Sequence, residues 1–177
     1  PGGKPGADDS TRPERKSPNS KRVIIFSPHP DDDVVSMGGT FDRLVSQGHE
    51  VHIAYRVKGN IAVSDHDALK FIEVSKDMFK NDSKVPVSQL IKELTNNKPD
   101  KIDSQAVRDL KGFIRKREAI AATRYIGIPD SNTHFMNLPF YDTGRIKKNP
   151  PTKKDVLITA SLIKKIKPCL LYTSPSP

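Results

Sequence analysis

The sequence of 177 residues has one cysteine, no tryptophan and no long apolar run. A single cysteine excludes a disulfide framework and a cysteine-rich zinc site. No apolar run approaches the roughly 20 residues of a membrane span, so we expect a soluble chain without a membrane partner. No apolar segment typical of a signal peptide opens the sequence, which favours a cytoplasmic protein. The length fits one ordinary domain.

Negative charge is also in deficit, because 30 Lys+Arg stand against 21 Asp+Glu and give a formal net charge of +9. Such a balance raises the question of nucleic-acid binding. The basic residues form only small clusters, such as 111–117 and 164–167, and they make neither a basic stripe interleaved with aromatic residues nor a nucleic-acid motif. This pattern favours a solvated basic surface, and we expect no nucleic-acid partner.

Both ends of the chain differ in composition from the middle. Residues 1–21 are rich in Pro and Gly and almost devoid of apolar side chains, which predicts a disordered linker. The last nine residues, 169–177, are uncharged and contain Cys169. They resemble the translation of a sequencing adapter, so we expect a non-native, adapter-derived tail that lies outside the domain. The alternative is a natural apolar strand over 169–172.

The middle of the chain alternates strand and helix patterns. Val23–Phe26 is an apolar, β-branched run typical of a buried parallel strand, and Glu50–Val57 alternates as a second strand. A helix over Val34–Gln47, with Val35 on its apolar side, joins them into a βαβ unit. The sequence therefore predicts an α/β fold, a Rossmann-like sandwich with a mainly parallel sheet. Further helices are expected over 65–79 (capped by Asp65), 87–94, 105–125 (capped by Ser104, with Tyr125 on its apolar face) and 153–167, and a third strand over 133–138.

A cluster of polar residues follows the first strand directly. His29, Asp31, Asp32 and Asp33 lie where ligand sites occur in open α/β sheets, outside the carboxyl end of a central strand. Zinc binds imidazole nitrogen and carboxylate oxygen, and an Asp that is not a ligand can take a proton from water. The spacing favours a metal site. The alternative is an acidic turn whose carboxylates cap the helix that begins near Val34.

Three motifs carry a family resemblance. The segment 27–33 (SPHPDDD), followed by Gly38-Gly39, resembles the signature of the LmbE-like or PIG-L-like family of zinc-dependent N-deacetylases. Residues 115–119 with Ile126-Gly127, and residues 138–144, are similar to the family's later helix and D-x-G loop. Together they cover residues 22–168, a partial LmbE-like domain.

The resemblance implies a role for each matching residue. His29 and Asp32 would be zinc ligands, and Asp31 would be the general base that deprotonates the attacking water. Arg115 would be the active-site arginine, with Glu118 one helical turn away. Asp142 would contact sugar hydroxyls. A solvated helix face remains the alternative for Arg115, and a simple turn residue for Asp142.

The chain departs from the family pattern at two points. Asp33 stands where the family usually has Glu, which we expect to change a supporting contact and not a ligand. The family's third ligand is a downstream histidine, and none of the remaining histidines (His49, His52, His66 and His134) matches it. The related motif follows a segment like Ile166–Pro168. We therefore expect a C-terminally truncated domain, inactive by itself and weak in zinc binding.

A closer resemblance, carried by residues 1–16, 36–52 and 59–71, is to long bacterial proteins described as glucosamine-6-phosphate deaminases. It implies that residues 1–21 link an absent deaminase domain to this one, and that any oligomer forms through the parent protein. The function implied is zinc-dependent hydrolysis of the N-acetyl group of a small-molecule amino sugar. Deamination by the parent with this domain auxiliary, and a non-catalytic sugar-binding module, are the alternatives.

Overall fold

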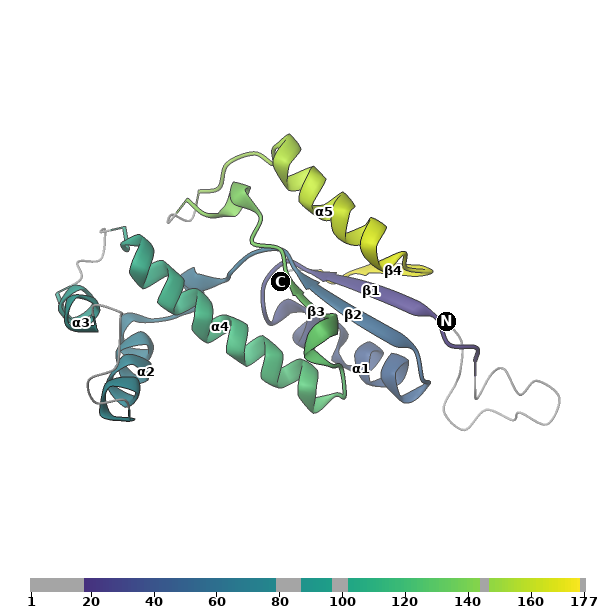
Figure 1. Ribbon diagram of the computed structural model, residues 1–177, viewed down its shortest axis with the longest axis horizontal. Coiled ribbons are helices and arrows are strands. Elements are labelled where there is room, and N and C mark those ends of the chain that lie inside the picture. The colour runs from purple at the N-terminus through teal and green to yellow at the C-terminus, as the bar shows by residue number, and fades with distance from the viewer. Residues whose placement is uncertain (1–17, 79–86, 97–101, 144–146, 176–177) are drawn as a thin grey trace.

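The computed structural model describes residues 18–78, 87–96, 102–143 and 147–175. Most of the expected linker and Gly144 lie outside these ranges. Four strands, β1 (Arg22–Ser27), β2 (Glu50–Tyr55), β3 (Thr133–Phe135) and β4 (Leu170–Thr173), form one sheet in the order β3-β2-β1-β4. Every pairing in this sheet is parallel, which confirms the predicted α/β class (Figure 1).

Helices cover both faces of the sheet. On one face, Val23 and Ile25 of β1 pack with Phe41 and Leu44 of α1 (Asp32–Ser46). On the other face, Ile24 and Phe26 pack with α5 (Lys153–Ile166). Figure 1 shows α1 and α5 on opposite sides of the sheet. Because successive side chains of a strand point to opposite faces, the apolar run of β1 serves both layers.

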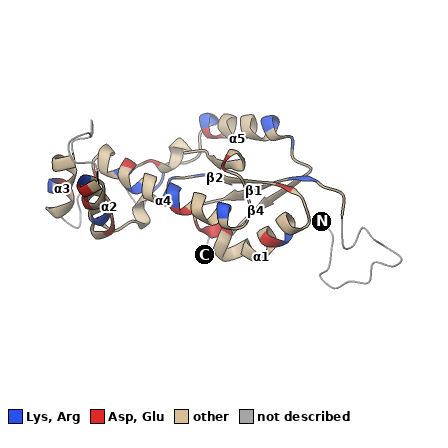
Figure 2. Ribbon diagram, turned by 60° about the horizontal axis from the view of Figure 1, so that its bottom comes forward, with Lys and Arg blue, Asp and Glu red and all other residues tan. Residues whose placement is uncertain are grey.

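A second apolar cluster lies beside the sheet. It is built by α2 (Asp65–Met78), α3 (Val87–Thr95) and the first half of α4 (Gln105–Tyr125), through residues such as Ile72, Leu94 and Val107. The buried Lys111 Nζ of α4 holds the cluster together, because it lies 2.6 Å from an Asp65 oxygen and 2.7 Å from an Asp103 oxygen. Charges of both signs occur along α1, α2, α4 and α5 (Figure 2).

The helix ends test the predicted caps. Ser104 accepts a hydrogen bond from the Val107 N–H at 3.3 Å, as expected for the α4 cap. The cap of α2 is Ser64, whose hydroxyl accepts from the Asp67 N–H at 3.0 Å, so the expected cap at Asp65 is wrong. Val35 and Tyr125 are 77% and 93% exposed, so their predicted places on apolar faces are wrong as well.

The C-terminal segment lies inside the fold of this structure. β4 pairs with β1 in the register Val23↔Leu170 to Phe26↔Thr173, as in the alternative of an apolar strand. Leu170 and Tyr172 pack on the cluster under α1, because alternation places both on the same face of the sheet. Residues 170–173 are thus part of the sheet in this structure, and the domain boundary at residue 168 stays a prediction. That residues 169–177 are non-native stays a prediction.

No helix among the described residues is long and apolar enough to span a membrane.

Candidate functional site

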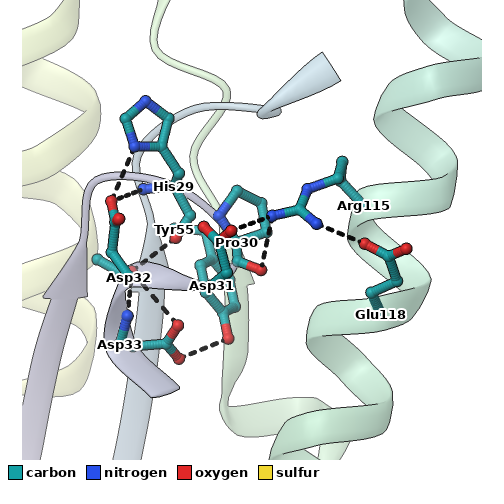
Figure 3. A network of polar contacts seen from close by, with 9 residues as sticks. His29, Pro30, Asp31, Asp32, Asp33, Tyr55, Arg115 and Glu118 are labelled. Atoms are coloured by element: carbon teal, nitrogen blue, oxygen red, sulfur yellow. Dashed lines mark hydrogen bonds and ion pairs between the residues drawn. The ribbon is translucent and has the colours of Figure 1, made fainter. Parts of the chain in front are cut away.

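The candidate site lies at the carboxyl end of β1, where the chain turns into α1 (Figure 3). Ser27, the last residue of the strand, shapes this turn. Its hydroxyl donates to the His29 carbonyl oxygen at 2.6 Å and accepts from the Asp33 N–H at 3.1 Å. Asp31, at the N-cap position of α1, makes no side-chain capping bond. The alternative of an acidic capping turn therefore does not account for Asp31.

Asp33 is fully buried beneath this turn. It accepts a 2.7 Å hydrogen bond from the Tyr55 hydroxyl at the end of β2, and Ser27 lies 3.4 Å from its other oxygen. Burial raises the pKa of Asp33, against the opposing effect of the bonds from Tyr55 and Ser27. Burial and the nearby carboxylate also raise the pKa of Tyr55, so its hydroxyl stays protonated and donates. Asp33 thus connects the turn to the end of β2 through its hydrogen bond from Tyr55.

His29 and Asp32 converge above the turn. The His29 Nδ1 lies 2.8 Å from the Asp32 Oδ2, and the same oxygen accepts from the His29 N–H at 3.0 Å. Two ligand atoms about 2.0–2.1 Å from a tetrahedral zinc lie about 3.3 Å apart, close to this separation. Asp32 is 5% exposed, whereas His29 reaches the surface at 35% of its side-chain area. The pair fits as two ligands of one metal ion.

The third ligand is not found in the described ranges, where no group of three or more His, Cys, Asp or Glu residues could hold a metal. A catalytic zinc site ordinarily has three protein ligands. His52 and His134 face each other instead, with 3.1 Å between Nδ1 and Nε2, and His52 also lies 3.0 Å from a Glu50 oxygen. Burial and the neighbouring His52 lower the pKa of His134 to about 4.

Asp31 is held by an arginine from α4. The Arg115 Nη2 lies 2.7 Å from the Asp31 Oδ2, and its Nη1 lies 2.6 Å from the Glu118 Oε2 (Figure 3). Arg115 is only 14% exposed and thus is not part of a solvated helix face. The structure brings Asp31, Arg115 and Glu118 together in one chain of ion pairs that begins beside the His29–Asp32 pair.

Asp142 lies farther along the same side of the molecule, just after the short helix η4 (Pro139–Tyr141). Its two oxygens are each 3.6 Å from a cation, Lys58 Nζ and Arg108 Nε. The Lys58 Nζ also contacts Asp109 at 2.9 Å. Asp142 is 36% exposed and half-open to solvent. Its position next to Tyr141 is compatible with both the sugar contact and the simple turn.

Tyr141 is a site residue to which the sequence assigned no role. Its ring packs edge-on against the His29 ring, with 5.6 Å between centroids. Both rings line a cleft of about 570 Å³ that also includes Phe140, Arg56 and Lys148. Cavities of a few hundred Å³ are the size of small-molecule sites. A signal was available, since Tyr141 stands directly before Asp142 in the third motif.

Gly59 supports the site from the loop after β2. Its φ of +67° is a left-handed conformation that favours glycine. A Cβ at this position would lie 2.8 Å from the Pro30 Cδ and 3.6 Å from the Arg115 Nε. The absence of a side chain at Gly59 therefore lets Pro30 of the turn pack closely against it, whereas the distance to Arg115 would be an ordinary contact.

A family model and a named relative match most of the chain. The family model described as PIG-L, GlcNAc-PI de-N-acetylase, matches residues 24–176. The chain is 48% identical over 181 residues to a Bacteroides thetaiotaomicron protein named as glucosamine-6-phosphate deaminase-like. That match covers 98% of this chain and 27% of the relative, so the chain spans about a quarter of the relative's length.

Two solved structures also resemble the chain. One is a deacetylase in complex with teicoplanin from the biosynthesis pathway of teicoplanin, with 16% identity and a TM-score of 0.45, covering 86% of this chain and 57% of that one. The other is a zinc-inhibited form of a teicoplanin deacetylase, with 18% identity and a TM-score of 0.44, covering 86% and 55% of the two chains.

Proposed function

The chain belongs to the PIG-L (GlcNAc-PI de-N-acetylase) family, and from this premise we propose that it is part of a zinc-dependent hydrolase that removes the N-acetyl group of an amino sugar. Family membership makes the domain a deacetylase-type hydrolase. The substrate and the metal are our proposal. The observation that carries it is the convergence of the His29 Nδ1 and the Asp32 Oδ2 at 2.8 Å, with Asp31 in the same turn.

Each residue of the turn has a distinct task in this proposal. His29 and Asp32 would hold the metal, with a third ligand from outside the described residues, and the bound metal would supply polarisation of the amide carbonyl. Asp31 takes a proton from the attacking water, because it is the carboxylate of the turn that is half-exposed (53%) and outside the ligand pair. Arg115 positions Asp31, because its Nη2 lies 2.7 Å from the Asp31 Oδ2.

A second candidate concerns the whole protein. The relative from Bacteroides thetaiotaomicron is named as glucosamine-6-phosphate deaminase-like, and this chain spans 27% of it. We propose as the alternative that the parent protein deaminates glucosamine-6-phosphate, with the present domain auxiliary. The two candidates differ in the bond that breaks. Amide hydrolysis releases acetate, whereas deamination of the sugar releases ammonia.

The test measures acetate release from N-acetylglucosamine and its phosphates by the full-length parent protein, with and without a zinc chelator. We expect the chelator to abolish acetate release, and Asp31→Asn to lower kcat about 10²–10⁴-fold, the usual contribution of a general base. Asp42→Asn, the same change at an exposed position of α1, should leave the rate unchanged. Undiminished acetate release by Asp31→Asn would refute the role of Asp31.

The 177-residue chain itself supplies an independent measurement. With only His29 and Asp32 as ligands, we expect zinc binding that is weak and is lost by dialysis. Tight zinc binding at one ion per chain would refute this expectation, because it would show that the 177 residues supply a third ligand themselves.

A further inference from the structure

The charged side chains that line the cleft beside His29 are all positive. Its lining contains two cations, Arg56 and Lys148, and no carboxylate. The rest of the lining is mainly apolar and aromatic and includes Phe140, Tyr141 and Ile61. A metal ion held by His29 and Asp32 would make the positive charge at this end of the cleft larger still.

The backbone of Arg56 is held by two hydrogen bonds, whereas its side chain is exposed. Its N–H donates to the Ser27 carbonyl at 3.0 Å, and its carbonyl accepts from the Leu138 N–H at 2.9 Å. It thus follows β2 at the same sheet edge as the candidate site. Within the described ranges, its exposed guanidinium makes no hydrogen bond or ion pair. A guanidinium presents paired N–H donors that match a phosphate or carboxylate.

Lys148 approaches the cleft from the segment after η4. Its Nζ lies over the Tyr141 ring, 3.8 Å from the centroid, and Tyr141 in turn contacts His29. Burial lowers the pKa of Lys148, against the opposing effect of Asp142. The ammonium group is therefore destabilised in the free chain, and an anion in the cleft would offset that cost.

We propose that this cleft binds the phosphate group of a phosphorylated N-acetylamino sugar, with Arg56 and Lys148 as its cationic ligands and Tyr141 as an apolar wall for the sugar. The inference rests on the proposed function for the sugar, and it adds the class of substrate. The phosphate would lie on the Arg56–Lys148 side of His29, which leaves the acetamido group toward Asp31 and Arg115.

The experiment measures binding and not turnover, on the 177-residue chain treated with a chelator. N-acetylglucosamine, its 1-phosphate and its 6-phosphate are titrated by NMR or calorimetry at low salt. We expect at least one phosphate to bind about tenfold or more tightly than the neutral sugar, since a charge-assisted hydrogen bond contributes that much. This preference should weaken as salt is raised, because the ligands are partly exposed.

Two variants locate the contact. Arg56→Gln and Lys148→Gln should each remove most of the preference for the phosphorylated sugar while leaving the affinity for the neutral sugar within about twofold. Lys147→Gln is the matched control, because Lys147 is the exposed neighbour of Lys148 and does not line the cleft. An unchanged melting temperature checks that the Arg56 variant is folded.

The outcomes separate this inference from the proposed function. Equal affinity for neutral and phosphorylated sugars, or a preference that survives both substitutions, would overturn the phosphate site even if the parent protein releases acetate. A preference that depends on Arg56 and Lys148 would support it even if no acetate is released, and the deacetylase proposal alone would then fail.

Discussion

Replacing Tyr55 by Phe removes one oxygen beneath the candidate site and tests how the buried Asp33 is held. The lost bond is the 2.7 Å contact from the Tyr55 hydroxyl to a carboxylate with no exposed surface. The cost depends on the charge of Asp33. A hydrogen bond between neutral groups contributes about 0.5–1.5 kcal/mol, and one to a charged group about 1.5–3 kcal/mol. We therefore expect Tyr55→Phe to be about 1 kcal/mol more destabilising when Asp33 is ionised.

The direction with pH follows from the raised pKa of Asp33. Between the ordinary value of 3.8 and the raised value, the folded chain keeps a proton that the unfolded chain has lost. The stability from this group is therefore complete below 3.8 and falls as pH rises through the folded pKa. Tyr55→Phe removes a bond that lowers this pKa, so in the variant the fall continues to a higher pH.

The assay is urea unfolding of both proteins at pH 4 and pH 8, supported by thermal melts. A difference of about 1 kcal/mol corresponds to about 2–4 °C in Tm for a domain of this size. Tyr125→Phe is the matched control, since this side chain is 93% exposed. If Tyr55→Phe cost the same free energy at both pH values, or no more than Tyr125→Phe, Asp33 would not be a buried carboxyl held by Tyr55.

Two further predictions concern single residues. Gly59→Ala should lower the free energy of unfolding by about 1–3 kcal/mol, because of the positive φ and the 2.8 Å approach of a Cβ to Pro30. Gly39→Ala, inside α1 with no neighbour within 4 Å, should instead raise the free energy of unfolding by about 0.5–1 kcal/mol. Urea unfolding measures both changes, and a neutral Gly59→Ala would contradict the geometry. An NMR titration should show the His134 ring protonating near pH 4, so that its contribution to stability is lost as pH falls from 6.5 toward 4; a midpoint at or above 6.5 would show that its ring is not desolvated against His52.

The strands β1 and β2 and the turn after β1 were predictable from the sequence because their signals are local. The β-branched run at Val23–Phe26 can be buried on both faces only as a central strand, and the cluster His29–Asp33 follows it within a few residues. The loop between them is too short to carry these side chains away from the sheet edge. The α/β class and the place of the candidate site therefore followed from adjacency in the chain.

What the sequence could not predict depends on contacts between distant segments. The family motif distinguishes Arg115 from Arg117, but nothing in the helical pattern of α4 predicts that Arg115 contacts Asp31 across the boundary between α4 and the turn. In the sequence Tyr55 is an ordinary strand residue, and only the structure shows that its hydroxyl donates a hydrogen bond to the buried Asp33. Val35 has helical spacing but faces solvent, because α1 rests on the sheet through Phe41 and Leu44.

Composition alone does not reveal the place of residues 170–173 in the sheet. An uncharged tail with small polar residues is typical of a disordered end, yet Leu170 and Tyr172 alternate as a strand does. On the side opposite β2, the edge of β1 would be unpaired without β4, and β4 supplies the hydrogen bonds there. The competing factor is the need of a buried strand for a partner on each side, which composition does not reveal.

Helix α4 belongs to two packing units, because Ile114 lies in the cluster with α2 and α3, whereas Ala119 lies in the cluster with the sheet. Arg115 stands at the junction between these two units. The position of Arg115, which contacts the proposed base Asp31, therefore depends on how α4 packs in both units. We expect that a substitution in the α2–α3 cluster that shifts α4 would also change the contact between Arg115 and Asp31, although the substituted residue lies far from any reacting atom.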